Sequence, residues 1–179
     1  MNTLSYGLLS LLTRGSRTGY ELMLHIQPFW PAKHSQIYPL LARLEQNGYV
    51  QFVHVPQSDK PDKKVYSLTS LGEDALREWM VMPTDEPVLR DEFALKVYCI
   101  GLVDKGQALK VLLDRENYYK KKMEKFALSF EQLKNDSSKP LEELSLEDPL
   151  FGIYLLIGKA RGKVKADLEW CQWMKSKLR

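Results

Sequence analysis

The chain has few of the residues that build disulfide-linked or metal-bound folds. Among its 179 residues there are only two cysteines and three histidines. Cys99 and Cys171 form no CxxC pair and are too few for a disulfide framework. Both lie in apolar helical patterns, so we expect two reduced core residues in a cytoplasmic protein. The histidines have neither HxxxH nor HExxH spacing, so we expect no metal site and no cofactor.

Long hydrophobic runs and catalytic signatures are also missing. The longest apolar stretches are far shorter than the roughly 18 residues of a membrane span. No charged segment followed by an apolar stretch marks the N-terminus as a signal peptide. No P-loop, GxGxxG or GxSxG signature occurs. These absences argue against a membrane protein and against an enzyme.

Net charge is small, but it is concentrated in one part of the chain. The whole chain carries +3, with 44% hydrophobic and 27% charged residues, as in ordinary globular proteins. Residues 1–68 hold seven Lys or Arg against four Asp or Glu, so their excess of three equals the net charge of the whole chain. A local excess of this size permits contact with phosphate groups without requiring it.

Two short helices joined by a turn are predicted between residues 18 and 50. Thr18 and Glu21 have the spacing of a capping box, and Pro28 stops the first of the two helices. The second begins near Ser35 and ends at the Asn47-Gly48 pair, because both residues tolerate the left-handed conformation of a helix end. Its predicted buried stripe consists of Ile37, Leu40, Leu41 and Leu44.

A strand pair follows at once. Residues 49–55 and 65–68 are typical of strands, and the polar segment 56–64 between them contains two prolines. A further helix, capped by Thr69 or Ser70, comes next. This order of helix, turn, helix and hairpin is that of a winged helix-turn-helix domain, which presents one helix to a DNA major groove.

The candidate DNA contacts lie at the start of the second of these helices and on the hairpin. They are Lys33, Ser35, Gln36, Tyr38 and Arg43 on the helix, and Lys60, Lys63 and Lys64 on the hairpin. Amide groups at a helix N-terminus favour phosphate, glutamine can pair with adenine, and lysine neutralises phosphate. A solvated helix face and a solubilising loop are the alternatives, because Asp59 and Asp62 lie among the lysines.

The segment MPTDEP, residues 82–87, is the best candidate for a domain boundary, since it holds two prolines and two acids. We therefore expect a winged helix-turn-helix domain over residues 1–82 and a helical dimerisation domain, which is also the candidate effector-sensing domain, over 83–179. The expected fold class is mainly α with a small β-hairpin.

Beyond the boundary the pattern is entirely helical. A helix is expected over 89–103, and apolar residues recur every seven positions in two long ones, over about 105–133 and 149–176, as in a short coiled-coil seam. We expect a dimer interface made of Leu112, Tyr119, Met123, Phe126, Phe130, Ile157, Val164, Leu168 and Cys171.

Five aromatic residues near the expected domain junction form a candidate effector pocket: Tyr20, Phe29, Trp30, Trp170 and Trp173. Apolar pockets between domains commonly bind small molecules. Aromatic residues at helical spacing are more often part of a core or a dimer interface, so both interpretations stay open.

Several segments resemble the PadR family of transcriptional regulators. In the first half these are LSYGLLSLL near the start, TGYEL (18–22), IYPLLARLEQNGYV (37–50) and KVYSLTSLG (64–72). LRDEFALK and LEWCQWM in the second half are more loosely similar to the helical C-terminal domain of the larger PadR subfamily.

The resemblance implies a winged-helix repressor that dimerises through its C-terminal helices and binds double-stranded DNA at an inverted-repeat operator. In some members a small effector, a phenolic acid or a hydrophobic drug, releases the DNA. Two alternatives stay open for this chain. One is a winged-helix module that binds other proteins, and the other is a DNA binder without an effector.

Overall fold

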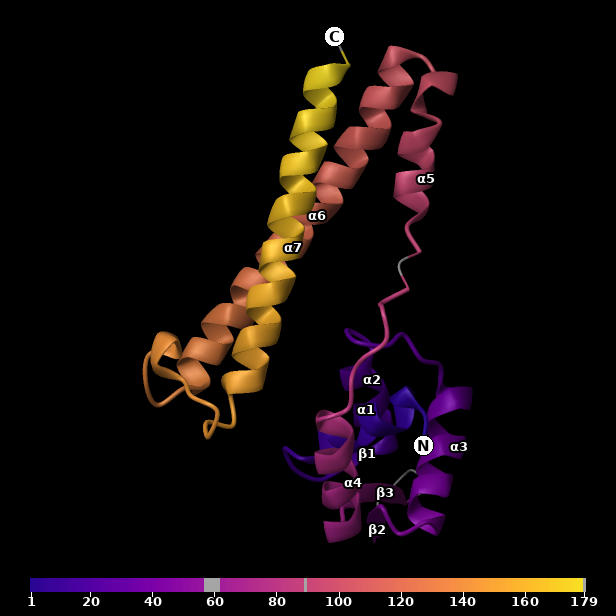
Figure 1. Cartoon of the computed structure of the whole chain (residues 1–179), viewed down its shortest axis with the longest axis vertical. Coiled ribbons are helices and arrows are strands. Elements are labelled where there is room, and N and C mark those ends of the chain that lie inside the picture. Colours follow the sequence, from indigo (N-terminus) through magenta and orange to yellow (C-terminus); the bar gives the residue numbers. More distant parts are fainter. Residues whose placement is uncertain (57–61, 89, 179) are drawn as a thin grey trace. The chain divides into compact units, whose positions relative to one another are not determined.

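The computed structural model describes residues 1–56, 62–88 and 90–178 (Figure 1). Its contacts divide the chain into two compact units, Met1–Pro87 and Val88–Arg179, which are described separately below. The division falls at the C-terminal end of the MPTDEP segment, whereas the sequence predicts a boundary after residue 82.

The first unit is a winged helix-turn-helix domain. Its elements are α1 (Thr3–Leu12), β1 (Arg17–Thr18), α2 (Gly19–Ile26), α3 (His34–Gln46), β2 (Val50–Val55), β3 (Lys63–Leu68) and α4 (Ser70–Met80). The strands form an antiparallel sheet in the order β1-β3-β2. The predicted hairpin is confirmed, with pairs running from Val50–Leu68 to Val55–Lys63. The sheet also contains strand β1, which pairs with β3. The sequence does not predict β1, because no alternating pattern marks it.

Local hydrogen bonds set the ends of these helices. The Thr18 hydroxyl accepts from the Glu21 N–H at 3.2 Å, and the Glu21 carboxylate accepts from the Thr18 N–H at 2.7 Å. The bond from the Thr18 backbone lowers the pKa of Glu21. Asn47 caps α3, and Gly48 follows with a φ of +74°. Helix α4 is capped by Thr69, whose hydroxyl accepts from the Gly72 N–H at 3.1 Å.

The core of this unit orients α3. Leu8 and Leu9 of α1 and Leu22 of α2 pack with Ile37 and Leu41 of α3, and all five are fully buried. Because these contacts hold one face of α3 inside the domain, the opposite face lies in solvent. Burying large aliphatic side chains contributes roughly 1.5–3 kcal/mol each, so this orientation is well determined.

The second unit is all helical. It contains α5 (Glu92–Tyr98), η1 (Ile100–Leu102), α6 (Lys105–Asp136), η2 (Leu141–Glu143) and α7 (Phe151–Lys177). The helix predicted over 89–103 is divided, because α5 ends at Cys99 and a short 3-10 turn follows. Cys171 is buried as predicted, but Cys99 is exposed, which corrects the expectation of two core cysteines. Cys99 caps the end of α5, so its side chain lies outside the apolar stripe.

The apolar residues that recur every seven positions in α6 and α7 pack against each other within this unit. Helices α6 and α7 run side by side in opposite directions (Figure 1). All nine residues predicted for the dimer interface lie in the apolar clusters between them. Leu112, Tyr119, Val164 and Cys171 are buried by the chain's own helices. The other five, Met123, Phe126, Phe130, Ile157 and Leu168, are only partly buried within the chain, so their place in a dimer interface stays a prediction. A heptad spacing identifies a helix partner without saying which chain supplies it.

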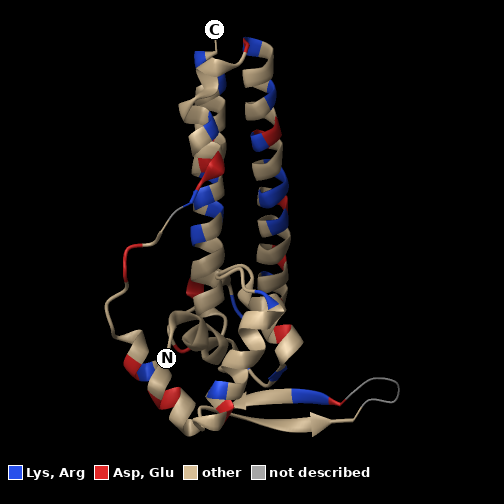
Figure 2. Cartoon of the chain, turned by 90° about the vertical axis from the view of Figure 1, so that its right-hand side faces the viewer, with Lys and Arg blue, Asp and Glu red and all other residues tan. Residues whose placement is uncertain are grey.

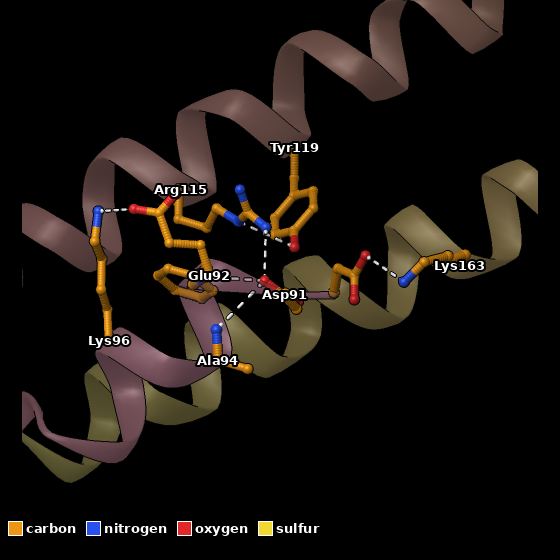
Figure 3. A network of polar contacts seen from close by, with 9 residues as sticks. Asp91, Glu92, Ala94, Lys96, Arg115, Tyr119 and Lys163 are labelled. Atoms are coloured by element: carbon orange, nitrogen blue, oxygen red, sulfur yellow. Dashed lines mark hydrogen bonds and ion pairs between the residues drawn. The ribbon is translucent and has the colours of Figure 1, made fainter. Parts of the chain in front are cut away.

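Polar contacts join the start of α5 to α6 (Figure 3). Asp91 caps α5 by accepting from the Phe93 N–H at 2.9 Å. Arg115 of α6 lies 3.5 Å from the Asp91 carboxylate and donates to the Tyr119 hydroxyl at 3.1 Å (Figure 3). Its guanidinium covers the Phe93 ring, with 4.7 Å to the centroid.

A second polar contact ties α6 to α7. The buried Glu116 carboxylate of α6 pairs with Lys175 of α7 and, at 3.0 Å, with Lys120. The hydrogen bond from Lys175 lowers the pKa of Glu116, because it favours the charged carboxylate. Within the described ranges, no helix is both long and apolar enough to cross a bilayer.

Candidate nucleic-acid interface

Helix α3 presents a regular exposed face opposite its buried stripe. Ile37, Leu41 and Leu44 point into the core. Successive residues of an α-helix are turned by about 100°, so the positions opposite this stripe are 35, 39, 42 and 46. Ser35, Pro39, Ala42 and Gln46 are all exposed. We call these four residues the outer ridge of α3.

Two predicted DNA contacts interact with each other at the start of α3. Lys33 is the exposed N-cap residue, and its N–H donates to Gln36 Oε1 at 3.0 Å. The side-chain oxygen of Gln36 therefore stabilises its own helix. Its amide N–H groups remain as donors, so contact with phosphate suits Gln36 better than paired contacts to adenine, which need both ends of the amide.

Tyr38 is held between two helices. Its ring stacks on His34 with centroids 4.0 Å apart. It also covers the start of α2, since a Cβ added to Gly19 would lie 3.0 Å from Tyr38 Cε1. The half-buried ring thus sets the distance between α2 and α3.

Arg43 is exposed on the side of α3 that faces α1. It lines a cavity of about 430 Å3 together with Asn2 and Ser5 from the start of α1 and Leu40, Leu44 and Asn47 of α3. Arg43 therefore lies at the α1 edge of the exposed face of α3.

The hairpin carries two exposed cations on one strand. Lys63 and Lys64 begin β3, where Figure 2 shows a basic segment. They belong to the strand rather than to the loop that the sequence predicts, and their register opposite Val55 and His54 is fixed by the sheet. The third predicted cation, Lys60, lies outside the described residues.

Phe52 is a residue of the hairpin that the sequence analysis missed. The Lys64 ammonium lies over its ring, 4.0 Å from the centroid. The ring also contacts His54 edge-on at 5.2 Å and Tyr66 at 5.7 Å. These contacts hold Lys64 in one orientation. The alternation along β2 could have indicated that Phe52 shares a face with His54.

Pro39, Ala42 and Gln46 of the outer ridge were also missed. A spacing of 35, 39, 42 and 46, opposite the stripe at 37, 41 and 44, is the signal that identifies them. Neither Pro39 nor Ala42 is among the predicted DNA contacts, because neither side chain carries a hydrogen-bonding group.

The five aromatic residues of the expected effector pocket are distributed over both units. In the first unit Tyr20, Phe29 and Trp30 are between 45% and 58% exposed. In the second unit Trp173 is exposed, and the half-buried Trp170 packs edge-on against Phe93 at 5.7 Å.

None of these five lines the cavity beside Arg43 or a second cavity of about 420 Å3 around Phe130 and Leu141. Among the residues that the structure describes, no group of three His, Cys, Asp or Glu side chains could hold a metal ion.

Comparisons with known proteins agree with this architecture. Residues 8–78 match the transcriptional regulator PadR-like family, and residues 89–179 match the virulence activator alpha C-terminal family. The chain is 34% identical over 178 residues to the negative transcriptional regulator PadR of Bacillus subtilis, covering 96% of this chain and 95% of that protein.

Two solved structures of Bacillus subtilis PadR are similar over nearly the whole chain. The complex with operator DNA has a TM-score of 0.84 at 31% identity, with 99% of this chain and 100% of that chain covered. The complex with p-coumaric acid has a TM-score of 0.77 at 30% identity, with 99% of each chain covered. The fold, the two family matches and this identity lead to one conclusion: the chain belongs to the PadR-like family of transcriptional regulators.

Proposed function

We propose that this protein is a sequence-specific DNA-binding repressor of transcription. One observation carries the proposal: α3 has a free outer ridge, and the hairpin that follows it presents Lys63 and Lys64. A winged helix-turn-helix domain inserts such a helix into the major groove while its cations neutralise phosphates. The relative of known structure forms a complex with operator DNA.

A gel-shift assay at physiological salt tests this proposal. The probe is the DNA upstream of the protein's own gene, with excess non-specific duplex as competitor. We expect a shift that survives the competitor, with an affinity at least about 1,000-fold above that for random DNA. A protein that shifts no DNA would instead be a winged-helix module that binds other proteins.

We further propose that the repressor is a homodimer whose contacts include the segment from α5 to η1. Leu95, Tyr98 and Leu102 are 71%, 94% and 87% exposed, so they carry apolar surface that the protomer leaves in water. In a symmetric dimer, two copies of α3 would meet successive major grooves about 34–36 Å apart, which matches an inverted-repeat operator.

Replacing Tyr98 and Leu102 together by glutamate should shift the protein to a monomer. Both side chains make few contacts in the protomer, so its melting temperature should fall only because the dimer is lost. Sedimentation velocity measures the change, and Leu128→Glu, at a similarly exposed position on α6, is the control. A double variant that stays dimeric would place the interface elsewhere.

The third element of the proposal is release by a small effector, with a phenolic acid as the first candidate. The similar Bacillus subtilis protein has been crystallised with p-coumaric acid. A ligand releases DNA by binding better to the dimer state that binds operator worse.

The effector element is tested by titrating p-coumaric acid into the protein–operator complex. We expect DNA release that saturates, and weaker p-coumaric acid binding to the operator-bound dimer than to the free dimer. Equal binding to both forms would leave a DNA-binding regulator that does not respond to this compound.

A further inference from the structure

We propose that α3 identifies its operator through the methyl groups of thymine, which contact Pro39 and Ala42 on its outer ridge. This inference rests on the proposed function and adds its sequence specificity. Thymine is the one DNA base with a methyl group in the major groove, and small apolar side chains recognise that group by direct packing.

The composition of the outer ridge favours this kind of contact. Its centre consists of Pro39 and Ala42, flanked by Ser35 and Gln46. None of these four described residues carries a positive charge. Lysine or arginine is needed for the paired hydrogen bonds to guanine, so guanine at the centre of the site would have no such partner on the outer ridge. Small side chains also let the helix axis approach the base edges closely.

The other candidate base contacts on α3 are engaged elsewhere. The Gln36 oxygen accepts from the Lys33 N–H at 3.0 Å. The Tyr38 ring lies between His34 and Gly19 on one side of the helix. Arg43 lies on the opposite side, at the cavity beside α1. What remains at the centre of the exposed face is apolar.

Pro39 supplies an independent argument. It lies inside α3, in the second turn, and is exposed. Its ring removes the amide that would donate to the Ser35 carbonyl, which makes proline the least favourable residue inside a helix. Because the ring is not buried in the core, packing within the domain does not offset this cost. A proline that lowers helix stability without packing in the core favours a binding role for its exposed ring.

The test replaces single thymines by deoxyuridine, which lacks only the methyl group. Full-length protein first selects its binding sites from a pool of random duplexes, and each thymine of the selected site is then substituted in turn. We expect one or two positions in each half-site at which the Kd rises roughly fourfold, the effect of losing one buried methyl.

Two variants assign these positions to residues. Pro39→Ser should raise the melting temperature by restoring the helical amide, and yet lower the ratio of the deoxyuridine Kd to the thymine Kd toward 1 at one position, because a polar side chain replaces the apolar ring. Ala42→Ser should lower this ratio at another position. Ala127→Ser makes the same change on an exposed position of α6 and should alter neither ratio.

The outcomes separate the inference from the proposed function. If the protein selects a site but no deoxyuridine substitution changes its affinity, thymine methyl recognition is excluded while the DNA-binding function stands. If the ratio of the deoxyuridine Kd to the thymine Kd stays as high in both variants as in the wild type, Pro39 and Ala42 are not the residues that contact the thymine methyl groups. If no DNA is selected at all, both the proposed function and this inference fail.

Discussion

Replacing Lys63 and Lys64 by alanine should weaken binding to every DNA sequence by roughly tenfold or more near 150 mM salt. It should also lower the slope of log K against log salt by about 2, since each lysine that neutralises a phosphate releases close to one counterion. Both side chains are exposed on β3, and the Phe52 ring holds the Lys64 ammonium at 4.0 Å. The relative preference for operator over random DNA should change little, because phosphates carry no base sequence.

Fluorescence anisotropy with operator and random duplexes, at several salt concentrations, measures both effects. A matched control replaces Lys110 and Lys121, two exposed lysines of α6, by alanine, so that the net charge of the protein falls equally. The control should leave the slope nearly unchanged. An affinity of the Lys63 and Lys64 variant that equals wild type at two salt concentrations would remove the hairpin from the interface.

A second large effect is expected for Gly72→Ala, which should destabilise the winged unit by about 3 kcal/mol, at the upper end of the usual cost of overpacking. A Cβ at position 72 would lie 2.7 Å from Leu68 Cδ1 and closer still to the carbonyl oxygen of Tyr49. A backbone carbonyl cannot rotate away as a side chain can. The Tyr49 carbonyl also accepts from the Thr69 N–H at 3.2 Å, so moving it breaks the bond that joins α4 to the start of β2.

Denaturant unfolding of the full chain, followed by circular dichroism, measures this effect. Gly158→Ala is the control, because position 158 lies within α7 and an added Cβ meets nothing within 4 Å. Alanine there should raise helix stability by about 0.5–1 kcal/mol. The two substitutions should thus change the free energy of unfolding in opposite directions. Equal changes would contradict the close approach of Gly72 to Tyr49.

The Gly72 contact brings two of the PadR-like segments together in space. IYPLLARLEQNGYV ends next to Tyr49, and KVYSLTSLG ends at Gly72. More than twenty residues separate these positions in the chain, and no spacing rule relates them. The folded domain brings them into contact through the β2–β3 hairpin.

Features set by neighbouring residues were predictable from the sequence. The capping box at Thr18, the helix end at Asn47-Gly48 and the buried stripe of α3 depend on contacts within a few positions. Their hydrogen bonds and side-chain periods follow from local backbone geometry. The winged helix-turn-helix fold and the family resemblance rest on these local features.

Features that depend on distant parts of the chain were not predictable. Strand β1 is two residues long and exists only because β3 pairs with it. The exposure of Cys99 follows from the break after α5, and the intramolecular seam follows from the return of α7 along α6. A heptad pattern is the same whether the facing helix comes from one chain or two.

The sequence by itself determined the helix, turn, helix and hairpin order of the first unit, the buried stripe of α3 and the location of the basic hairpin. Each is encoded in residues close together along the chain. Only the tertiary structure decided what covers the buried stripe of α3, which is the apolar face formed by α1 and α2. It also decided that the predicted dimer seam is filled by the chain's own helices. Exposure depends on what packs against a side chain, and for both features those neighbours come from distant parts of the chain.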